Sequence, residues 1–185
     1  MRIIAGRFKG RRLKTPSWNG LRPTSDKLRE TLFNILAARV AGARVLDGFA
    51  GTGAVGIEAL SRGAGHVTFI EQDRRAAALI EANLEMCGQK QGYTIECGDV
   101  AAVLRRLSGN ATFDLILLDP PYDIESGAVT TTLEAAAGRV AADGLVVLER
   151  ATRSSPVAPP SLSHVRDVRS GDSTLTCFAV QRELR

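Results

Sequence analysis

Residues 44–53 have the sequence RVLDGFAGTG, and this stretch decides the fold of the 185-residue chain. A short strand over 44–47 is predicted to end in Asp47, and the glycine-rich turn of 48–53 then opens a helix that continues to Ser61. Glycines let a backbone turn tightly and approach a ligand closely, and the first turn of a helix offers free N–H groups. The turn is not a P-loop, because no Gly-Lys-Ser or Gly-Lys-Thr follows it. Taken alone, it predicts either a ligand site or a purely structural bend.

Strands and helices are predicted to alternate on the C-terminal side of this turn. Residues 113–118 are nearly all apolar, which is typical of a strand that is buried on both faces. The alternation predicts right-handed βαβ units and a parallel sheet, whereas the last two strands, joined by 170–172, predict an antiparallel edge. The predicted strands are 66–71, 93–96, 113–118, 144–149, 164–169 and 174–181, and the predicted helices are 73–86, 100–107 and 127–138.

The N-terminal side of the turn is predicted to hold a hairpin and one helix. Residues 1–14 resemble a hairpin, 15–23 form a turn-rich connector, and 25–39 have one apolar face at helical spacing. Thr24 or Ser25 is predicted to cap that helix, because a Ser or Thr hydroxyl accepts a hydrogen bond from a free N–H group of the first turn.

Composition favours one domain of ordinary size. Hydrophobic residues make up 44% of the chain, and no apolar run approaches the roughly 18 residues that a membrane span needs. The basic N-terminus lacks the apolar segment of a secretory signal. Three cysteines without a Cys-x-x-Cys pair argue against a disulfide scaffold or a zinc site and favour a reducing cytoplasm. We expect an N-terminal extension over 1–23 ahead of one domain over 24–185.

The positive charge of the chain lies at its N-terminal end. Residues 1–30 carry nine Lys and Arg against two acids, a net charge of +7, whereas the remaining 155 residues carry −3. This asymmetry predicts a polyanionic partner. The alternative is a solvated tail that only improves solubility.

The next two strands end near acids that suit a nucleoside. Glu71 ends the strand after the glycine turn, 24 residues beyond Asp47, close to the roughly 20-residue offset at which an acid meets a ribose in dinucleotide folds. The alternative is a helix-capping acid, a role that Asp73 can take instead. Asp99 follows the third strand and is predicted to accept a hydrogen bond from an adenine amine, to cap the next helix, or both.

The most specific segment is Asp119-Pro120-Pro121-Tyr122, directly after the buried strand. Its two prolines restrict the backbone, so that the carbonyl of Pro120 has a fixed direction beside the carboxylate of Asp119. Two such acceptors can hold both hydrogens of an exocyclic amine while Tyr122 lies against a base. This arrangement suits methylation at an amine nitrogen, where positioning supplies much of the catalysis. A rigid turn with a buried Tyr would explain Pro-Pro-Tyr alone.

Together, 47–53 and 119–122 resemble S-adenosylmethionine-dependent amino-methyltransferases. The N-terminal MRIIAGRFKGRRL and the stretch RPTSDKLRETLFN of 22–34 further resemble the RsmD family, bacterial enzymes that methylate the N2 amine of guanine 966 in 16S ribosomal RNA. The resemblance implies a Rossmann-like α/β fold, with a mostly parallel seven-stranded sheet, an antiparallel C-terminal edge and an N-terminal β-hairpin. It also implies a 16S rRNA substrate within a small-subunit ribosomal particle, a monomeric enzyme, and neither a metal nor a covalent enzyme intermediate.

The target guanine that the resemblance implies would have to be extruded if it is stacked on its neighbours. A position in an accessible loop would lower that cost.

The resemblance assigns roles to three groups of residues. The cofactor group comprises Asp47, Gly48, Phe49, Ala50, Gly51, Gly53, Glu71, Gln72, Asp99 and Val100. The catalytic group, which holds the guanine, comprises Asp119, Pro120, Pro121 and Tyr122, and the RNA-binding group comprises Arg2, Arg7, Lys9, Arg11, Arg12, Lys14, Arg22, Thr24 and Arg29.

Other functions fit parts of the pattern. A DNA methyltransferase acting on adenine N6 or cytosine N4 could use the same segment, but no separate target-recognition domain is visible. A cytosine-C5 enzyme needs a cysteine nucleophile, commonly after proline, and the chain has no Pro-Cys. A nicotinamide oxidoreductase would leave 119–122 without a purpose. A non-catalytic RNA-binding protein with a retained S-adenosylmethionine pocket is the remaining alternative.

Overall fold

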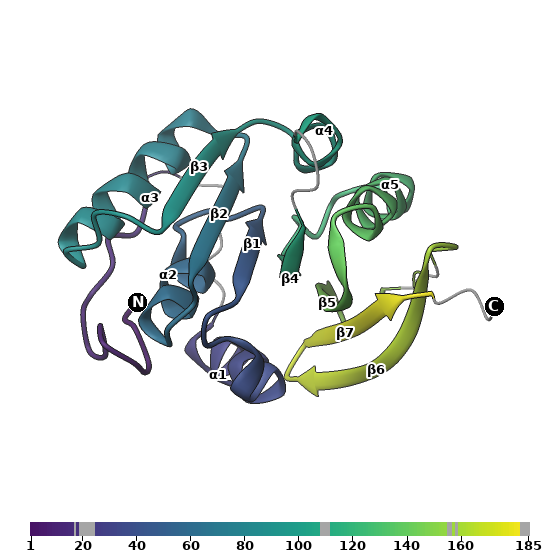
Figure 1. Ribbon diagram of the computed structural model, residues 1–185, viewed down its shortest axis with the longest axis horizontal. Coiled ribbons are helices and arrows are strands. Elements are labelled where there is room, and N and C mark those ends of the chain that lie inside the picture. The colour runs from purple at the N-terminus through teal and green to yellow at the C-terminus, as the bar shows by residue number, and fades with distance from the viewer. Residues whose placement is uncertain (17, 19–24, 108–111, 155–156, 158, 182–185) are drawn as a thin grey trace.

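A computed structural model describes residues 1–16, 18, 25–107, 112–154, 157 and 159–181 (Figure 1). It contains one seven-stranded sheet, whose strands have the order β3-β2-β1-β4-β5-β7-β6. The strands are β1 (Arg44–Gly48), β2 (His66–Glu71), β3 (Tyr93–Cys97), β4 (Phe113–Leu118), β5 (Val140–Ala151), β6 (Leu162–Ser170) and β7 (Ser173–Val180). The helices are α1 (Asp26–Leu36), α2 (Ala54–Ser61), α3 (Arg74–Met86), α4 (Val100–Arg106) and α5 (Ser126–Ala137), with a short 3-10 turn over Ala37–Arg39.

The sheet has the predicted mixture of directions. Strands β1 to β5 pair in parallel, whereas β7 pairs antiparallel with both β5 and β6. The predicted Rossmann-like fold with an antiparallel C-terminal edge is therefore confirmed. The chain leaves β1 toward β2 on one side and returns to β4 on the other side. Ligands of open α/β sheets bind at such a switch point, outside the carboxyl ends of the strands.

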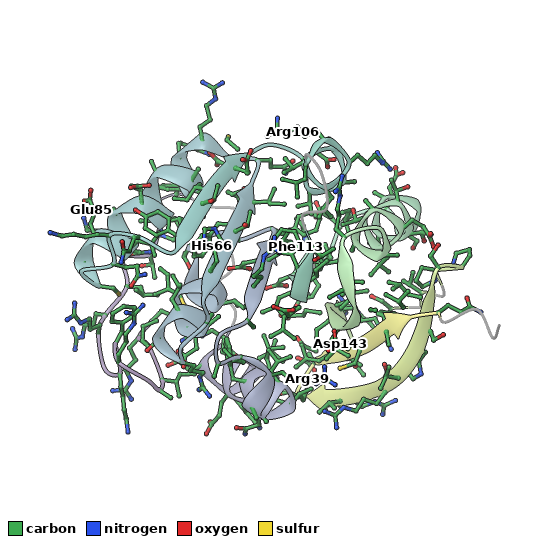
Figure 2. The ribbon with its side chains drawn as sticks, in the orientation of Figure 1. Arg39, His66, Glu85, Arg106, Phe113 and Asp143 are labelled. Atoms are coloured by element: carbon green, nitrogen blue, oxygen red, sulfur yellow. The ribbon has the colours of Figure 1, made fainter. Side chains whose placement is uncertain are left out.

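Helices cover both faces of the sheet. Apolar side chains of α1, α2 and α3 form one buried cluster with the sheet and the N-terminal segment, and those of α4 and α5 form a second cluster on the other face. Side chains fill the space between the layers, while Glu85 and Arg106 lie at the periphery (Figure 2). The two faces explain why 113–118 is nearly all apolar, since both sides of β4 are covered.

The N-terminal segment over 1–14 folds back on itself and docks on α2. Arg2 and Arg12 form an antiparallel bridge, and Ile3, Phe8 and Leu13 are buried in the first cluster. This pairing is the predicted hairpin, reduced to a single bridge. Its buried apolar residues show that the segment is part of the core.

Two polar side chains of α2 hold this segment. The buried carboxylate of Glu58 accepts hydrogen bonds from the backbone N–H of Ile4 at 2.8 Å and of Ala5 at 3.0 Å. Ser61 Oγ accepts a hydrogen bond from the Phe8 N–H at 2.9 Å. Gly6 has φ +79°, and a Cβ there would lie 1.9 Å from the Ser61 carbonyl oxygen, so only glycine allows this close approach.

The observed boundaries differ from the predicted ones at a few places. Ser25 caps α1 as predicted, its side chain accepting from the Leu28 N–H, but α1 ends at Leu36 because Ala37 has φ +42°. Strand β5 is longer than the predicted 144–149, since antiparallel pairing with β7 extends it to Ala151. Among the described helices, none combines the length and the apolar character that crossing a bilayer requires.

Candidate active site

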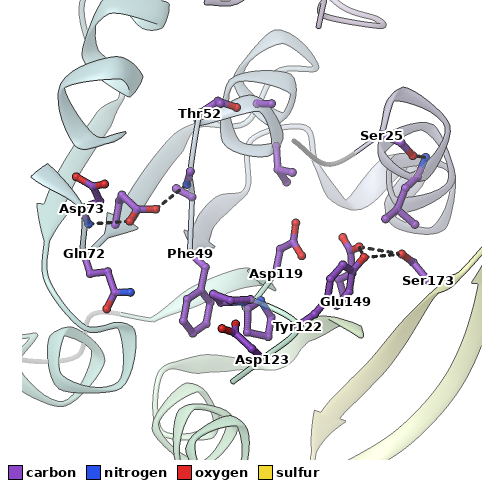
Figure 3. A pocket seen from close by; sticks show the side chains of 18 of the residues that line it. Ser25, Phe49, Thr52, Gln72, Asp73, Asp119, Tyr122, Asp123, Glu149 and Ser173 are labelled. Carbon is purple, nitrogen blue, oxygen red and sulfur yellow. Dashed lines mark hydrogen bonds between the residues drawn. The ribbon is translucent and has the colours of Figure 1, made fainter. Parts of the chain in front are cut away.

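A cavity of about 590 Å³ opens where β1, β2 and β4 end (Figure 3). Its lining brings the glycine turn after β1, the end of β2 and the predicted catalytic segment after β4 together in one place. Of the predicted site residues, the lining includes Phe49, Ala50, Gly51, Glu71, Gln72, Asp119, Pro120, Pro121 and Tyr122. A volume in this range suits a nucleoside-sized ligand.

Glu71 connects the end of β2 to the glycine turn. Its Oε2 accepts a hydrogen bond from the Gly51 N–H, and its Oε1 accepts one from the Asp73 N–H, both at 2.8 Å. A carboxylate oxygen has two lone pairs, so each oxygen retains one for a ligand. The carboxylate is thus held in place before any ligand arrives. Asp73 also caps α3, accepting from the Arg75 N–H at 2.8 Å, which is the alternative capping role that the sequence suggested for it.

Asp47, near the end of β1, is almost entirely buried and is not among the residues that line the cavity. Its Oδ2 accepts a hydrogen bond from the Gly56 N–H of α2 at 2.8 Å. The pKa of Asp47 is raised to about 8, chiefly by burial; the Gly56 hydrogen bond lowers it, and the nearby Asp119 and Glu71 contribute to raising it. Its neighbours Asp119 and Glu71 line the cavity, so a positive charge on a ligand there would favour the ionised form of Asp47.

The turn itself contains a strained residue. Phe49 has φ +62°, a conformation that bulky side chains rarely adopt, and its side chain lines the cavity. The Ala50 N–H donates to the Ile70 carbonyl at 3.0 Å, which fixes the turn against β2. Such strain is common where a binding site requires one particular backbone shape.

The segment over 119–122 follows β4 at the opposite wall. The Asp119 N–H donates to the Gly48 carbonyl at 3.3 Å, so the segment begins against the end of β1. Tyr122 is 51% exposed, with its hydroxyl 3.4 Å from Glu149 Oε1. Its ring therefore presents a flat surface at the cavity while its hydroxyl is held at the wall.

Several predicted cofactor residues lie outside the cavity lining. Gly48 and Gly53 have structural reasons to be glycine: a Cβ would lie 2.7 Å from the Leu118 side chain at Gly48 and 3.0 Å from the Ile80 side chain at Gly53. Asp99 is exposed and caps α4, with Oδ1 accepting from the Ala102 N–H at 2.8 Å. Val100 is buried in the second cluster. The adenine contacts expected of Asp99 and Val100 remain predictions.

The predicted RNA-binding residues fall into three groups. The six on the N-terminal segment are all exposed: Arg2, Arg7, Lys9, Arg11, Arg12 and Lys14. Arg22 and Thr24 lie outside the described residues. Arg29 corrects the prediction, because it has no exposed surface. Its Nη2 donates to the Arg2 carbonyl and to Asp26, both at 2.7 Å, so it cannot reach an RNA phosphate.

The structure adds cavity residues that the sequence reasoning missed. Glu149 and Ser173 come from β5 and β7, and their side chains are joined by a hydrogen bond of 3.0 Å. Trp18 and Arg75 also line the cavity, with the Arg75 guanidinium 4.9 Å from the centre of the Trp18 ring. The only signal for Glu149 in the sequence was an acid at the end of an apolar strand. The antiparallel edge that brings Ser173 to it is a tertiary feature.

The chain is similar to known proteins over its whole length. The family model described as Conserved hypothetical protein 95 matches residues 1–179. A relative from Escherichia coli (strain K12), named Ribosomal RNA small subunit methyltransferase D, is 34% identical over 184 residues, which cover 99% of this chain and 90% of the relative.

Solved structures share the fold. The structure of yhhF from Escherichia coli, described as a candidate methyltransferase, is 32% identical, covers 99% of both chains and has a TM-score of 0.84. The structure of SMU.776, described as a candidate methyltransferase complexed with SAH, has a TM-score of 0.67 and 18% identity. It covers 84% of this chain and 49% of that one, so it supports the fold alone.

Proposed function

The chain belongs to the RsmD family, described as Conserved hypothetical protein 95, and on this premise we propose that it methylates the N2 amine of guanine 966 in 16S ribosomal RNA. It is an S-adenosylmethionine-dependent methyltransferase of ribosomal RNA. The nitrogen and the nucleotide position are the finer parts of the proposal. The observation that carries it is the joint lining of one cavity by Glu71, the glycine turn and the segment Asp119-Pro120-Pro121-Tyr122.

The residues around the glycine turn fit S-adenosylmethionine. Glu71 would hold the ribose through the lone pairs that its two backbone hydrogen bonds leave free. The turn over 49–51 would contact the methionine moiety, and the acids Glu71 and Asp119 of the lining, with Asp47 near them, suit its ammonium and sulfonium charges. When bound, the cofactor supplies an electrophilic methyl group, and the protein supplies binding and orientation.

The opposite wall would hold the guanine. Tyr122 would stack on the base, while the Asp119 carboxylate and the Pro120 carbonyl accept the two hydrogens of the N2 amine. Both acceptors would favour a pyramidal nitrogen with an available lone pair. The bound cofactor would supply the methyl group and leave as S-adenosylhomocysteine, and the amine would release one proton to solvent. Asp119 stabilises the positive charge that develops on the nitrogen.

The basic N-terminal segment would bind RNA phosphates. Its six exposed cations surround a core of apolar residues that fixes the segment on α2, so the charges have a defined arrangement. Phosphate contacts of this kind position a nucleic acid and make its affinity depend on salt.

Methyl transfer from radiolabelled S-adenosylmethionine to unmethylated small-subunit particles tests the proposal. Asp119→Ala should lower the rate at least about 100-fold, because one preorganised group facing the developing charge is lost. Binding of S-adenosylhomocysteine, followed by calorimetry, should stay within about threefold of the wild type.

Asp143→Ala is the matched control, since Asp143 is exposed near the start of β5, whereas the cavity residue Glu149 lies near the other end of that strand. It should leave the rate unchanged. Near-normal turnover by the Asp119 variant would refute the amine-holding role. Mass spectrometry of the product then locates the methyl group, and a methyl group on any other atom or nucleotide would refute the finer parts of the proposal.

A further inference from the structure

Glu149 is a buried acid beside the proposed target-base site. Leu118 of β4 pairs with Leu148 of β5, and the next residues along the chain are Asp119 and Glu149, respectively. The strand order puts β5 on the side of β4 away from β1 and β2. Figure 3 accordingly shows Glu149 next to Asp119, on the side opposite to Gln72 and Asp73. Glu149 therefore lies at the part of the cavity that the proposed cofactor site leaves free.

Hydrogen bonds fix the direction of the Glu149 carboxyl group, which is only 7% exposed. Ser173 Oγ donates to Oε1 at 3.0 Å, and the Tyr122 hydroxyl donates to the same oxygen at 3.4 Å. Asp119 is within hydrogen-bonding reach of the carboxyl group. A buried acid that is held by three side chains, from β7 and from the segment after β4, has a restricted orientation, and two of these side chains, Ser173 and Tyr122, also bond to each other.

Base chemistry distinguishes what such an acid can recognise. In guanine, two ring nitrogens flank the carbon that bears the N2 amine: N1 carries a hydrogen and is a donor, whereas N3 is an acceptor. In adenine and cytosine, the ring nitrogen next to the exocyclic amine is an acceptor. A carboxylate adjacent to the amine-holding Asp119 therefore complements guanine alone, because it would face an unprotonated nitrogen in the other two bases.

We propose that Glu149 accepts a hydrogen bond from the N1–H of the target guanine and thereby selects guanine over other amine-bearing bases. This inference rests on the proposed function. The role needs an ionised carboxyl group. In the free protein, burial and the neighbouring Asp119 raise the pKa of Glu149 to about 8. A cationic cofactor and the N–H donors of the base both favour the ionised form.

The test uses 2-aminopurine, which keeps the N2 amine but lacks a hydrogen on N1. Small-subunit particles are reconstituted with 16S rRNA that carries either guanosine or 2-aminopurine riboside at the target position. The wild type should prefer guanosine by at least about 10-fold in kcat/KM, the loss that one hydrogen bond to a charged group brings. In Glu149→Met, which has a similar size but no acceptor, the preference should fall to within about threefold.

Two further variants make the result specific. Glu149→Gln keeps one acceptor oxygen and should recover part of the preference, which a purely structural role would not predict. Glu81→Gln is the matched control, because Glu81 is exposed on α3 and bonds to the Tyr93 hydroxyl; it should keep the wild-type preference. Binding of S-adenosylhomocysteine should be unchanged in all variants.

Each contrary outcome has a separate meaning. A Glu149→Met protein that binds S-adenosylhomocysteine and keeps the wild-type preference would overturn this inference alone. A wild type with the same kcat/KM for 2-aminopurine riboside and for guanosine would also overturn this inference. A wild type that binds S-adenosylhomocysteine but methylates neither particle would overturn the proposed function and this inference with it.

Discussion

At the scale of single residues, the cavity is unusual for its concentration of acids. Glu71, Asp119 and Glu149 line it, and the buried Asp47 lies near Glu71 and Asp119. The pKa values of Asp47 and Glu149 are raised to about 8, chiefly by burial. Protons on these groups relieve the repulsion in the empty protein. A positively charged ligand relieves it in another way, so ligand binding and proton release should be linked.

Asp47→Asn should remove a pH dependence from S-adenosylmethionine binding. Asp47 is mostly protonated in the free protein at pH 7, and the cofactor's positive charges favour its ionised form, so binding releases a proton. The affinity of the wild type should then rise with pH, by up to about tenfold per unit, in the range below pH 8. The variant should lack this part of the rise.

Titration calorimetry between pH 6 and 8, in two buffers of different ionisation enthalpy, measures both the affinity and the protons released. The amino group of the cofactor titrates equally with both proteins, so the difference between them isolates Asp47. Identical pH profiles would show that the cofactor does not change the protonation of Asp47.

At the scale of elements, the N-terminal segment over 1–14 both packs into the core and carries exposed positive charge. Its cations are exposed, but Ile3, Phe8 and Leu13 belong to the core, and Glu58 and Ser61 bond to its backbone. Deleting 1–14 would therefore expose apolar surface on α1 and α2 as well as remove charge. Substituting charges separates the two roles.

Replacing Arg2, Lys9 and Arg12 together by Ala should weaken RNA binding and leave S-adenosylhomocysteine binding unchanged. Each lost phosphate contact should reduce the slope of log affinity against log salt by roughly 0.7 to 0.9. Filter binding to 16S rRNA fragments measures both quantities. The salt concentration is varied between about 50 and 300 mM, where phosphate contacts determine much of the affinity.

The matched control removes the same charge elsewhere. Arg105, Arg153 and Arg169 are exposed on α4, after β5 and on β6. Their replacement by Ala should change the slope less. An equal change in both triple variants would show that net charge, and not the N-terminal segment, determines the affinity for RNA.

At the scale of the whole molecule, one buried side chain joins the N-terminal segment to the glycine turn. Asn83 of α3 donates through Nδ2 to the Thr52 carbonyl at 3.0 Å and to the Lys14 carbonyl at 3.2 Å. Its Oδ1 accepts from the Lys14 N–H at 2.7 Å. The proposed RNA-binding and cofactor-binding regions thus share one amide group.

Asn83→Ala should lower the free energy of unfolding by about 1–3 kcal/mol, because the buried Thr52 carbonyl and the partly buried backbone groups of Lys14 lose their partner. It should also weaken both S-adenosylhomocysteine and RNA binding, since Asn83 contacts both regions. Urea denaturation and the two binding assays measure these effects. Asn34→Ala, at an exposed position of α1, is the control and should change none of them. Loss of stability without any loss of binding would limit Asn83 to a structural role.

Local patterns predicted most of the elements and half of the cavity. The strands at 66–71 and 113–118 have the predicted bounds because their apolar runs end sharply at acids and turns. The glycine turn and 119–122 are short contiguous segments, so their chemistry is visible in the sequence. Arg29 was misplaced because a basic residue on a helix with one apolar face gives no local sign that its guanidinium is buried.

The sequence by itself determined the alternation of strands and helices, the acidic ends of the parallel strands and the family, since each depends on residues that are neighbours along the chain. Only the tertiary structure decided that Glu149 and Ser173 lie beside Asp119, that Arg29 is buried and that Asn83 joins two distant segments. These contacts join residues from 24 to 69 positions apart, and their geometry depends on strand order and helix packing, which no local pattern encodes.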